Sequence, residues 1–303
     1  MQVGRFFSIT PLKIEPICSR ITPNFFRLNS VKDKERLYKM GRLSICIFGI
    51  FVFMSSVLSF AATGFEYQSD EHTLGLWHFN EGQGNAVKDA SKNKIKTVVE
   101  GKAKWDKANW NKAGGGHSLV FDGKTALAIP IKDTVGNKIL TPDHAITIEA
   151  WVYPTDLTAW KLVGAHWAGA VGKYHFGVSN GVPNMHVNTD KGTKNAKAPK
   201  IEINKWYHLA GSYDGKEIKI YVDGKLSEAV AHSGKLTTGS PWDVMIGTKA
   251  SREIHWVGLM DEVRFSSIAR KAEELSPNLA SGPTPVDLDS TKLPVFWANM
   301  KKR

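Results

Sequence analysis

Beyond residue 64, apolar and polar residues alternate with a period of two in short segments. In the segment 145–153 (AITIEAWVY), the alternate positions from Ile146 to Val152 are apolar and fall on one face of a strand, whereas Thr147 and Glu149 fall on the other. Such alternation is typical of a half-buried β-strand. The same criterion predicts strands at 117–121, 126–131, 145–153, 160–164, 174–178, 206–213, 218–222, 244–247 and 256–265.

Turn-forming dipeptides separate these segments. Asp-Gly pairs occur at 122–123, 214–215 and 223–224, and the third lies between IKIYV and KLSEAV. Type I′ turns favour Asp-Gly because both central residues take positive φ, so 218–230 is predicted to be a β-hairpin. The one convincing helical stretch is 269–275 (ARKAEEL). Many short strands with almost no helix predict an all-β, two-sheet antiparallel sandwich, with one domain over 65–280 and a proline-containing tail over 281–303.

The N-terminal residues 1–61 are predicted to be a targeting segment rather than a folded domain. Residues 43–60 (LSICIFGIFVFMSSVLSF) carry no charge, follow Lys39 and Arg42, and end in a small-residue exit before Ala62. This order is typical of a secretory signal peptide, and the alternative is an uncleaved membrane anchor. Met40 begins a conventional short basic start, so we hypothesise that translation starts there. The expected location is outside the cytoplasm: secreted, periplasmic or at the cell surface.

Charge and cysteine content narrow the possible functions. The chain has 303 residues and a formal charge of +11, but residues 1–42 hold nine Lys/Arg and three Asp/Glu, and the last three residues are all basic. The body is therefore close to neutral and lacks the basic face that nucleic-acid binding requires. Cys18 and Cys46 are the two cysteines, so no disulfide framework or thiolate metal site is available downstream.

Five segments in a fixed order resemble a known family. They are 75–94 (GLWHFNEGQGNAVKDASKNK), 118–130 (SLVFDGKTALAIP), 146–154 (ITIEAWVYP), 204–226 (NKWYHLAGSYDGKEIKIYVDGKL) and 258–275 (GLMDEVRFSSIARKAEEL). Together they resemble the laminin-G-like jelly roll of the concanavalin A-like lectin/glucanase superfamily. The resemblance implies two large antiparallel sheets, one concave and one convex. It also implies a non-catalytic module that binds glycans or protein partners, in some cases together with calcium.

Glycoside hydrolases that resemble this fold carry acidic residues alternating along one strand. Two carboxylates must face the same side to act as nucleophile and acid. Glu149 is alone in its segment, and Asp261 and Glu262 are adjacent, which in a strand points them to opposite faces. We therefore expect that the protein is not an enzyme. A divergent glycoside hydrolase is the weaker alternative.

The resemblance also implies where a structural Ca²⁺ would bind. The matching positions here are Asp261 and Asn80, where many relatives have Asp in place of Asn80. The alternative is that Asp261 is a structural turn residue without metal. Zinc is not expected, because the strand histidines show no close ligand spacing: His166, His175, His186 and His208.

Ten tryptophans, all after residue 76, are many for this length. Trp77, Trp151 and Trp206 are predicted to pack in the core. Four others lie at strand ends or beside Gly and Pro and are the candidate ligand-binding residues: Trp160, Trp167, Trp242 and Trp256. A ring at such an edge can stack on the apolar face of a sugar, and the alternative is that these rings too are buried. The lysine-rich segment 191–200 is predicted to be a solvated loop.

These observations predict an exported, single-domain, non-catalytic β-sandwich that recognises a carbohydrate or surface polymer. The alternative is a structural or adhesion protein that binds another protein by a sheet face or a set of loops. No nucleic-acid partner is expected, and membrane association is expected only if residues 43–60 remain uncleaved.

Overall fold

The computed structural model describes residues 66–110, 116–132, 134–169, 171–237 and 241–275. The predicted targeting segment 1–61 and the predicted tail 281–303 lie outside the described residues. None of the helices in the described residues has the length and hydrophobicity of a membrane-spanning segment.

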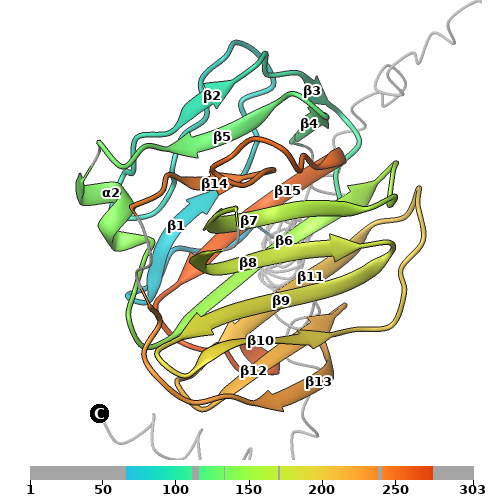
Figure 1. Cartoon of the computed structure of the whole chain (residues 1–303). Coiled ribbons are helices and arrows are strands. Elements are labelled where there is room, and N and C mark those ends of the chain that lie inside the picture. Colours follow the sequence, from blue (N-terminus) through green and yellow to red (C-terminus); the bar gives the residue numbers. More distant parts are fainter. Residues whose placement is uncertain (1–65, 111–115, 133, 170, 238–240, 276–303) are drawn as a thin grey trace, which may run out of the picture. The chain divides into compact units, whose positions relative to one another are not determined.

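The described residues form two antiparallel sheets packed face to face, as predicted (Figure 1). The first sheet has eight strands. Seven of them lie in the order β13 (Lys225–Ala231), β12 (Glu217–Val222), β11 (Tyr207–Tyr213), β6 (Ile146–Pro154), β15 (Val257–Ser266), β4 (Ser118–Asp122) and β3 (Trp105–Asp106). The eighth, β1 (Thr73–Trp77), pairs with β15.

The second sheet has seven strands and lies in front of the first in Figure 1. Its order is β10 (Gly192–Lys197), β9 (Val182–Thr189), β8 (Val171–Ser179), β7 (Trp160–Ala168), β14 (Val244–Ile246), β5 (Ala126–Ile129) and β2 (Val98–Glu100). The core lies between the two sheets, since the alternate residues Ile146, Ile148 and Val152 of β6 are completely buried there with Phe176 and Val178 of β8.

Backbone conformation explains the hairpin at the Asp-Gly pair 223–224. Asp223 and Gly224 have φ values of 50° and 73°, and they connect β12 to β13. Both central residues thus have the positive φ that a type I′ turn requires. The predicted hairpin is confirmed.

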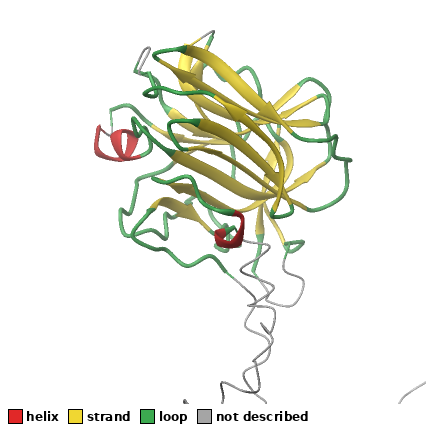
Figure 2. Cartoon of the chain, turned by 90° about the horizontal axis from the view of Figure 1, so that it is seen from below, coloured by secondary structure: helices red, strands yellow, loops and turns green. Residues whose placement is uncertain are grey.

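Helix is scarce, as predicted, but its positions differ from the prediction (Figure 2). The α-helix α2 (Thr134–Ile139) lies in a segment without a predicted element, whereas the expected helix 269–275 contains only the 3₁₀ turn η2 (Ala272–Glu274). The lysine-rich segment 191–200 was wrongly predicted to be a loop. It contains β10, an edge strand held by its ladder to β9 rather than by an apolar face.

Candidate functional site

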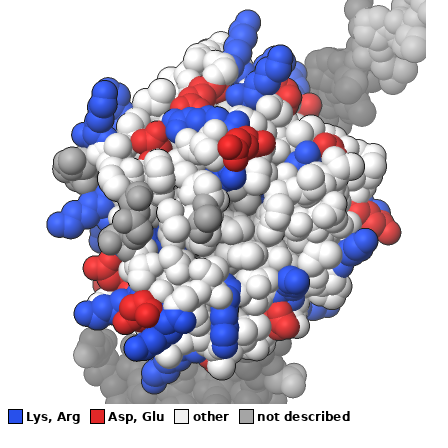
Figure 3. All heavy atoms as spheres, viewed as in Figure 1, with Lys and Arg blue, Asp and Glu red and all other residues white. Residues whose placement is uncertain are grey.

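The outer face of β7 and β8 carries an aromatic cluster. In β8, Tyr174, Phe176 and Val178 point into the core, so the residue between the first two, His175, points outward. Figure 3 shows this side of the molecule, and its central part is occupied largely by uncharged residues, with Lys and Arg more frequent toward the margin.

A β-bulge brings two tryptophans to the same face. Trp160 and Trp167 are seven positions apart, and a regular strand would place them on opposite faces. The β7–β8 register shifts between Leu162 and Gly164, where one extra residue is inserted in β7. A Cβ at Gly164 would lie 2.8 Å from Phe265 in the core, so this inward-facing position suits glycine. After the bulge Trp167 returns to the outer face.

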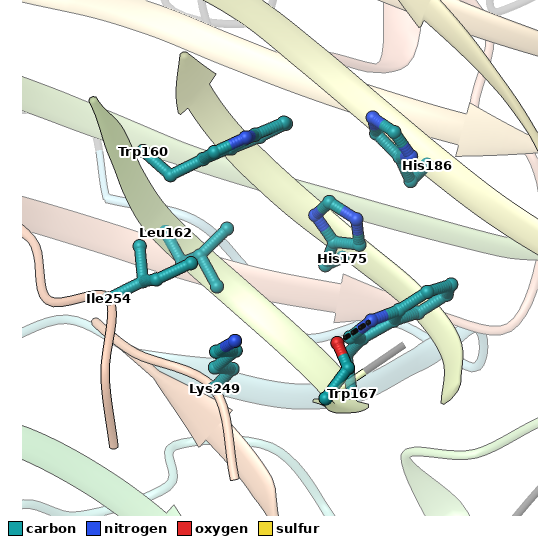
Figure 4. Close-up of a pocket in the computed structure, with 8 residues that line it drawn as sticks. Trp160, Leu162, Trp167, His175, His186, Lys249 and Ile254 are labelled. Carbon is teal, nitrogen blue, oxygen red and sulfur yellow. Dashed lines mark hydrogen bonds between the residues drawn. The ribbon is translucent and has the colours of Figure 1, made fainter. Parts of the chain in front are cut away.

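The four rings of this cluster contact one another closely (Figure 4). His175 and His186 stack with centroids 4.2 Å apart and planes 20° from parallel. Trp160 meets both imidazoles edge-on, at 5.1 and 5.4 Å. Trp167 meets His175 at 4.8 Å from the other side, and its Nε1–H donates to the carbonyl of Gly169 at 3.2 Å. We call these four rings, of Trp160, Trp167, His175 and His186, the aromatic platform.

This platform borders a cavity of about 300 Å³. Leu162 and Ile254 form an apolar wall, and the side chain of Lys249 adds a cation. Trp160 is partly exposed, whereas Trp167 is 8% exposed. The size and mixed apolar lining are those of a small-molecule site.

Both imidazoles are neutral at physiological pH. Burial lowers the pKa of His175 to about 3, with the charges of His186 and Lys249 adding to the effect. Burial and the charge of Lys197 lower the pKa of His186 to about 4. The Nδ1 atom of His175 is buried and has no hydrogen-bond partner in the described part of the chain. The atom is therefore enclosed by the neighbouring side chains.

Of the four predicted tryptophans, the structure brings together Trp160 and Trp167. Trp242 is half-buried against a separate cluster beside β5 and β14. Trp256 was expected at an accessible edge, which was wrong, because its ring is completely buried in the main core. Trp256 therefore offers no face for a ligand to stack on.

The residues predicted to bind calcium have other contacts. The Oδ1 atom of Asn80 accepts the N–H of His117 at 3.0 Å, and its Nδ2 donates to Glu66 at 2.8 Å. Asp261 is 3% exposed, and burial and then the charge of Glu262 raise the pKa of its carboxyl well above the usual range. Among the described residues, no three His, Asp or Glu side chains are grouped so as to hold a metal ion. These residues do not by themselves fit the six or more oxygens that Ca²⁺ takes.

A buried ionic network lies on the eight-stranded sheet. The carboxylate of Glu149 forms an ion pair with Arg264 at 2.6 Å and accepts a hydrogen bond from the hydroxyl of Tyr67 at 2.9 Å. The Nε2 atom of His208 lies 3.0 Å from the same carboxylate. Burial opposes ionisation of Glu149, but Arg264 and His208 outweigh it and lower the pKa of the carboxyl to about 2. The carboxylate is completely buried, so the network ties elements together and offers no accessible acid.

One sequence motif associated with nucleophilic serines occurs in the second sheet. Residues 177–181 (GVSNG) have the Gly-x-Ser-x-Gly spacing of a hydrolase nucleophile. That chemistry requires a strand–turn–helix elbow, but here the segment ends β8 and turns directly into β9. Ser179 pairs with Trp160 in the ladder, so the motif forms a hairpin.

The contribution of His175 and His186 was missed because they were considered separately. A signal for their pairing is present, since Asn180-Gly181 between them is a favoured two-residue turn. Such a turn places residues at equal distances from it opposite each other, and His175 and His186 are both five positions away.

Comparisons with known proteins match this architecture. A family model described as the concanavalin A-like lectin/glucanases superfamily matches residues 121–276. No curated protein matches the chain. Among solved structures, domain 4 of AbnA, a GH43 extracellular arabinanase from Geobacillus stearothermophilus, in complex with arabinotriose, is similar with a TM-score of 0.52 and 17% identity, over 69% of this chain and 97% of that one.

Two toxin binding domains are similar in the same way. The binding domain of Paraclostridial Mosquitocidal Protein 1 has a TM-score of 0.54 and 11% identity, over 69% of this chain and 52% of that one. The receptor binding domain of botulinum neurotoxin mosaic serotype C/D has a TM-score of 0.52 and 12% identity, over 70% and 51%. The chain thus spans about half the length of these toxin domains. At such identities, the likeness establishes a shared fold.

Proposed function

The chain belongs to the concanavalin A-like lectin/glucanases superfamily, and from that premise we propose that it is a non-catalytic carbohydrate-binding module. The observation that carries the proposal is the cavity of about 300 Å³ bordered by Trp160, Trp167 and the stacked imidazoles of His175 and His186. The similar arabinanase domain was solved in complex with arabinotriose, which supports a saccharide as the ligand class.

The chemistry of the cavity suits a sugar. A saccharide has apolar C–H faces and hydroxyl edges. The partly exposed indole of Trp160 supplies a flat apolar surface at small entropic cost. The ammonium of Lys249 in the cavity lining can donate a hydrogen bond to a hydroxyl. Because the rings already contact one another, little ordering is needed when a ligand binds.

The site residues support binding without catalysis. No Asp or Glu is among the described residues that line the cavity, so the pair of carboxylates that glycoside hydrolysis uses is not assembled there. Glu149 is inaccessible and strongly acidic, which suits neither a general acid nor a nucleophile.

We further propose that the module acts outside the cytoplasm, on the strength of the apolar segment 43–60 and its small-residue exit. Mass spectrometry of the exported protein should find a mature N-terminus at Ala62. Recovery of the intact segment in a membrane fraction would favour the anchor instead.

A glycan array probed with the purified protein and its Trp160→Ala variant tests the binding proposal. We expect the parent to retain one saccharide class and the variant to lose at least tenfold in affinity, because the stacking surface is removed. Trp206→Ala is the matched control, since Trp206 is a half-buried indole beside Tyr153 of the other sheet. Undiminished binding by a folded Trp160→Ala variant would contradict the proposal. Retention of a protein partner in place of any glycan would favour the adhesion alternative.

A further inference from the structure

Two lysines lie beside the aromatic platform on opposite sides. Lys249 follows β14 and lines the cavity together with the rings. Lys197 ends β10, on the other side of β9. We propose that the saccharide taken by this site is acidic, and that its carboxylates are bound by Lys249 at the cavity wall and by Lys197 beside the cavity. This inference rests on the proposed function and specifies its ligand class.

Lys249 is placed to meet an anion. The residue is 9% exposed, and its Nζ pairs with Glu253 at 2.6 Å. The Glu253 side chain is 64% exposed and does not line the cavity. The ammonium thus lies at the cavity wall while its partner lies on the solvent side. Its remaining N–H groups can donate to a carboxylate inside the cavity.

Lys197 shares the face of the imidazoles. In the β9–β10 ladder, Asn195 lies opposite His186, and Lys197 lies opposite Asn184, two positions along each strand. Residues two apart point to the same face, so Lys197 is a diagonal neighbour of His186. Among the described residues, the ammonium of Lys197 forms no ion pair, although the backbone N–H of the same residue donates to the carboxylate of Glu228 at 2.6 Å. Lys197 is exposed and lies outside the cavity lining, so its ammonium can reach a ligand that extends beyond the cavity.

The electrostatic potential at the two imidazoles agrees with the placement of the two lysines. Apart from burial, Lys249 contributes to the lowered pKa of His175, and Lys197 contributes to that of His186. Both contributions have the sign of a positive potential, and such a potential attracts an anion. A uronate, ionised at neutral pH, gains from this potential, whereas a neutral sugar of the same shape does not.

Two matched pairs of saccharides test the inference: oligogalacturonate against its fully methyl-esterified form, and hyaluronan oligosaccharide against its methyl ester. Each pair keeps the sugar and removes the charge. By titration calorimetry with the full protein at low salt, we expect one acidic form to bind at least tenfold more tightly than its ester. This preference should shrink in 0.5 M NaCl, where exposed charges more than about 4 Å apart are screened.

Variants locate the preference. Lys249→Met keeps the stem and removes the charge, so it should bring the affinities for acid and ester close together. Glu253→Gln frees Lys249 from its competing carboxylate and should tighten binding of the acid alone. Lys194→Gln is the control, because Lys194 lies on β10 like Lys197, but its ammonium donates to the carbonyl of Ala231 in the other sheet. It should leave both affinities unchanged.

Equal affinity for acid and ester, or binding of neither form in either pair, would overturn the inference. A preference that survives Lys249→Met with Lys197→Gln would also overturn it. The two proposals fail separately. If a neutral glycan binds and Trp160→Ala loses that binding, the proposed function holds but the ligand is not acidic, whereas undiminished binding by a folded Trp160→Ala variant contradicts the proposed function itself.

Discussion

His175 and His186 lie directly opposite each other on β8 and β9, and their imidazoles stack at 4.2 Å. The turn between the two strands sets this relationship. Asn180 and Gly181 have φ values of 48° and 84°, as a type I′ turn requires. A two-residue turn thus fixes the register, and the register places the two rings in contact between Trp160 and Trp167.

The first prediction compares two tryptophans of different burial. Trp77 is completely buried and contacts Phe265 edge-on, so Trp77→Ala should destabilise the fold by about 3–5 kcal/mol. Trp206 lies just before β11 and is half-buried, so Trp206→Ala should cost about 1–2 kcal/mol. Denaturant unfolding measures both. Equal losses would show that Trp206 is a core residue after all.

The sandwich could be predicted because its central strands are half-buried and alternate. The strand β10 could not, because an edge strand gains its stability from one backbone ladder and leaves Thr193 and Lys194 exposed. Trp256 follows a polar loop and was interpreted as an edge residue. Its backbone N–H donates to the carbonyl of Gly247, and the chain there folds back and inserts the indole between the sheets.

The candidate site was predictable in part. The positions of Trp160 and Trp167 near strand ends pointed to an accessible surface, but their odd spacing argues against a shared face. The bulge that reconciles them leaves no periodic signal, since it depends on the fit of Gly164 against Phe265. The alternation of apolar and polar residues predicts the strands, whereas an irregularity such as this β-bulge depends on how the strands pack.

The second prediction concerns the buried Glu149. Its folded-state pKa of about 2 lies below the usual 4.5, so the stability it contributes is complete above pH 4.5 and is lost as pH falls toward 2. Glu149→Gln leaves Arg264 buried without its counter-charge and should cost roughly 3–5 kcal/mol at pH 7. Urea unfolding at pH 7 and pH 3 measures both effects. A variant as stable as the parent at pH 7 would contradict this account of the network.

The third prediction concerns Asp261. Its folded-state pKa is raised, so the neutral acid stabilises the fold at low pH, and that contribution is lost as pH rises through the folded-state value. Asp261→Asn mimics the neutral acid. It should leave stability unchanged near pH 3 and increase it at pH 7, by about 1.4 kcal/mol for each unit by which the pKa is raised.

Calcium distinguishes the two interpretations of Asp261. If the residue ligated Ca²⁺, the metal would stabilise the folded chain by about 2.7 kcal/mol at a hundredfold excess over its dissociation constant. Because Asn80 is engaged by His117 and Glu66, we expect equal melting temperatures in millimolar calcium and in chelator. A melting temperature that rises with calcium, and no longer does so in Asp261→Asn, would restore the metal site.

The last prediction returns to the histidine pair. The pKa values of His175 and His186 are lowered from 6.5 to about 3 and about 4, because charging either ring means charging a buried group beside another imidazole and a lysine. A lowered pKa means that stability is complete above pH 6.5 and is lost as pH falls toward 4, a higher range than that of Glu149. The slope is at most about 1.4 kcal/mol per pH unit for each ring, and less for the partly exposed His186.

Two measurements check this. The imidazole NMR signals of both residues should not shift between pH 5 and pH 8, since neither ring takes up a proton there. His186→Phe keeps an aromatic ring on His175 and removes one titrating group, so its unfolding free energy should fall less steeply between pH 6.5 and pH 4 than that of the parent. A titration of either ring near pH 6.5 would mean that the stack is open to water. In that case the platform would be ordered by its ligand rather than before binding, and the affinity lost in Trp160→Ala would include the cost of assembling the rings.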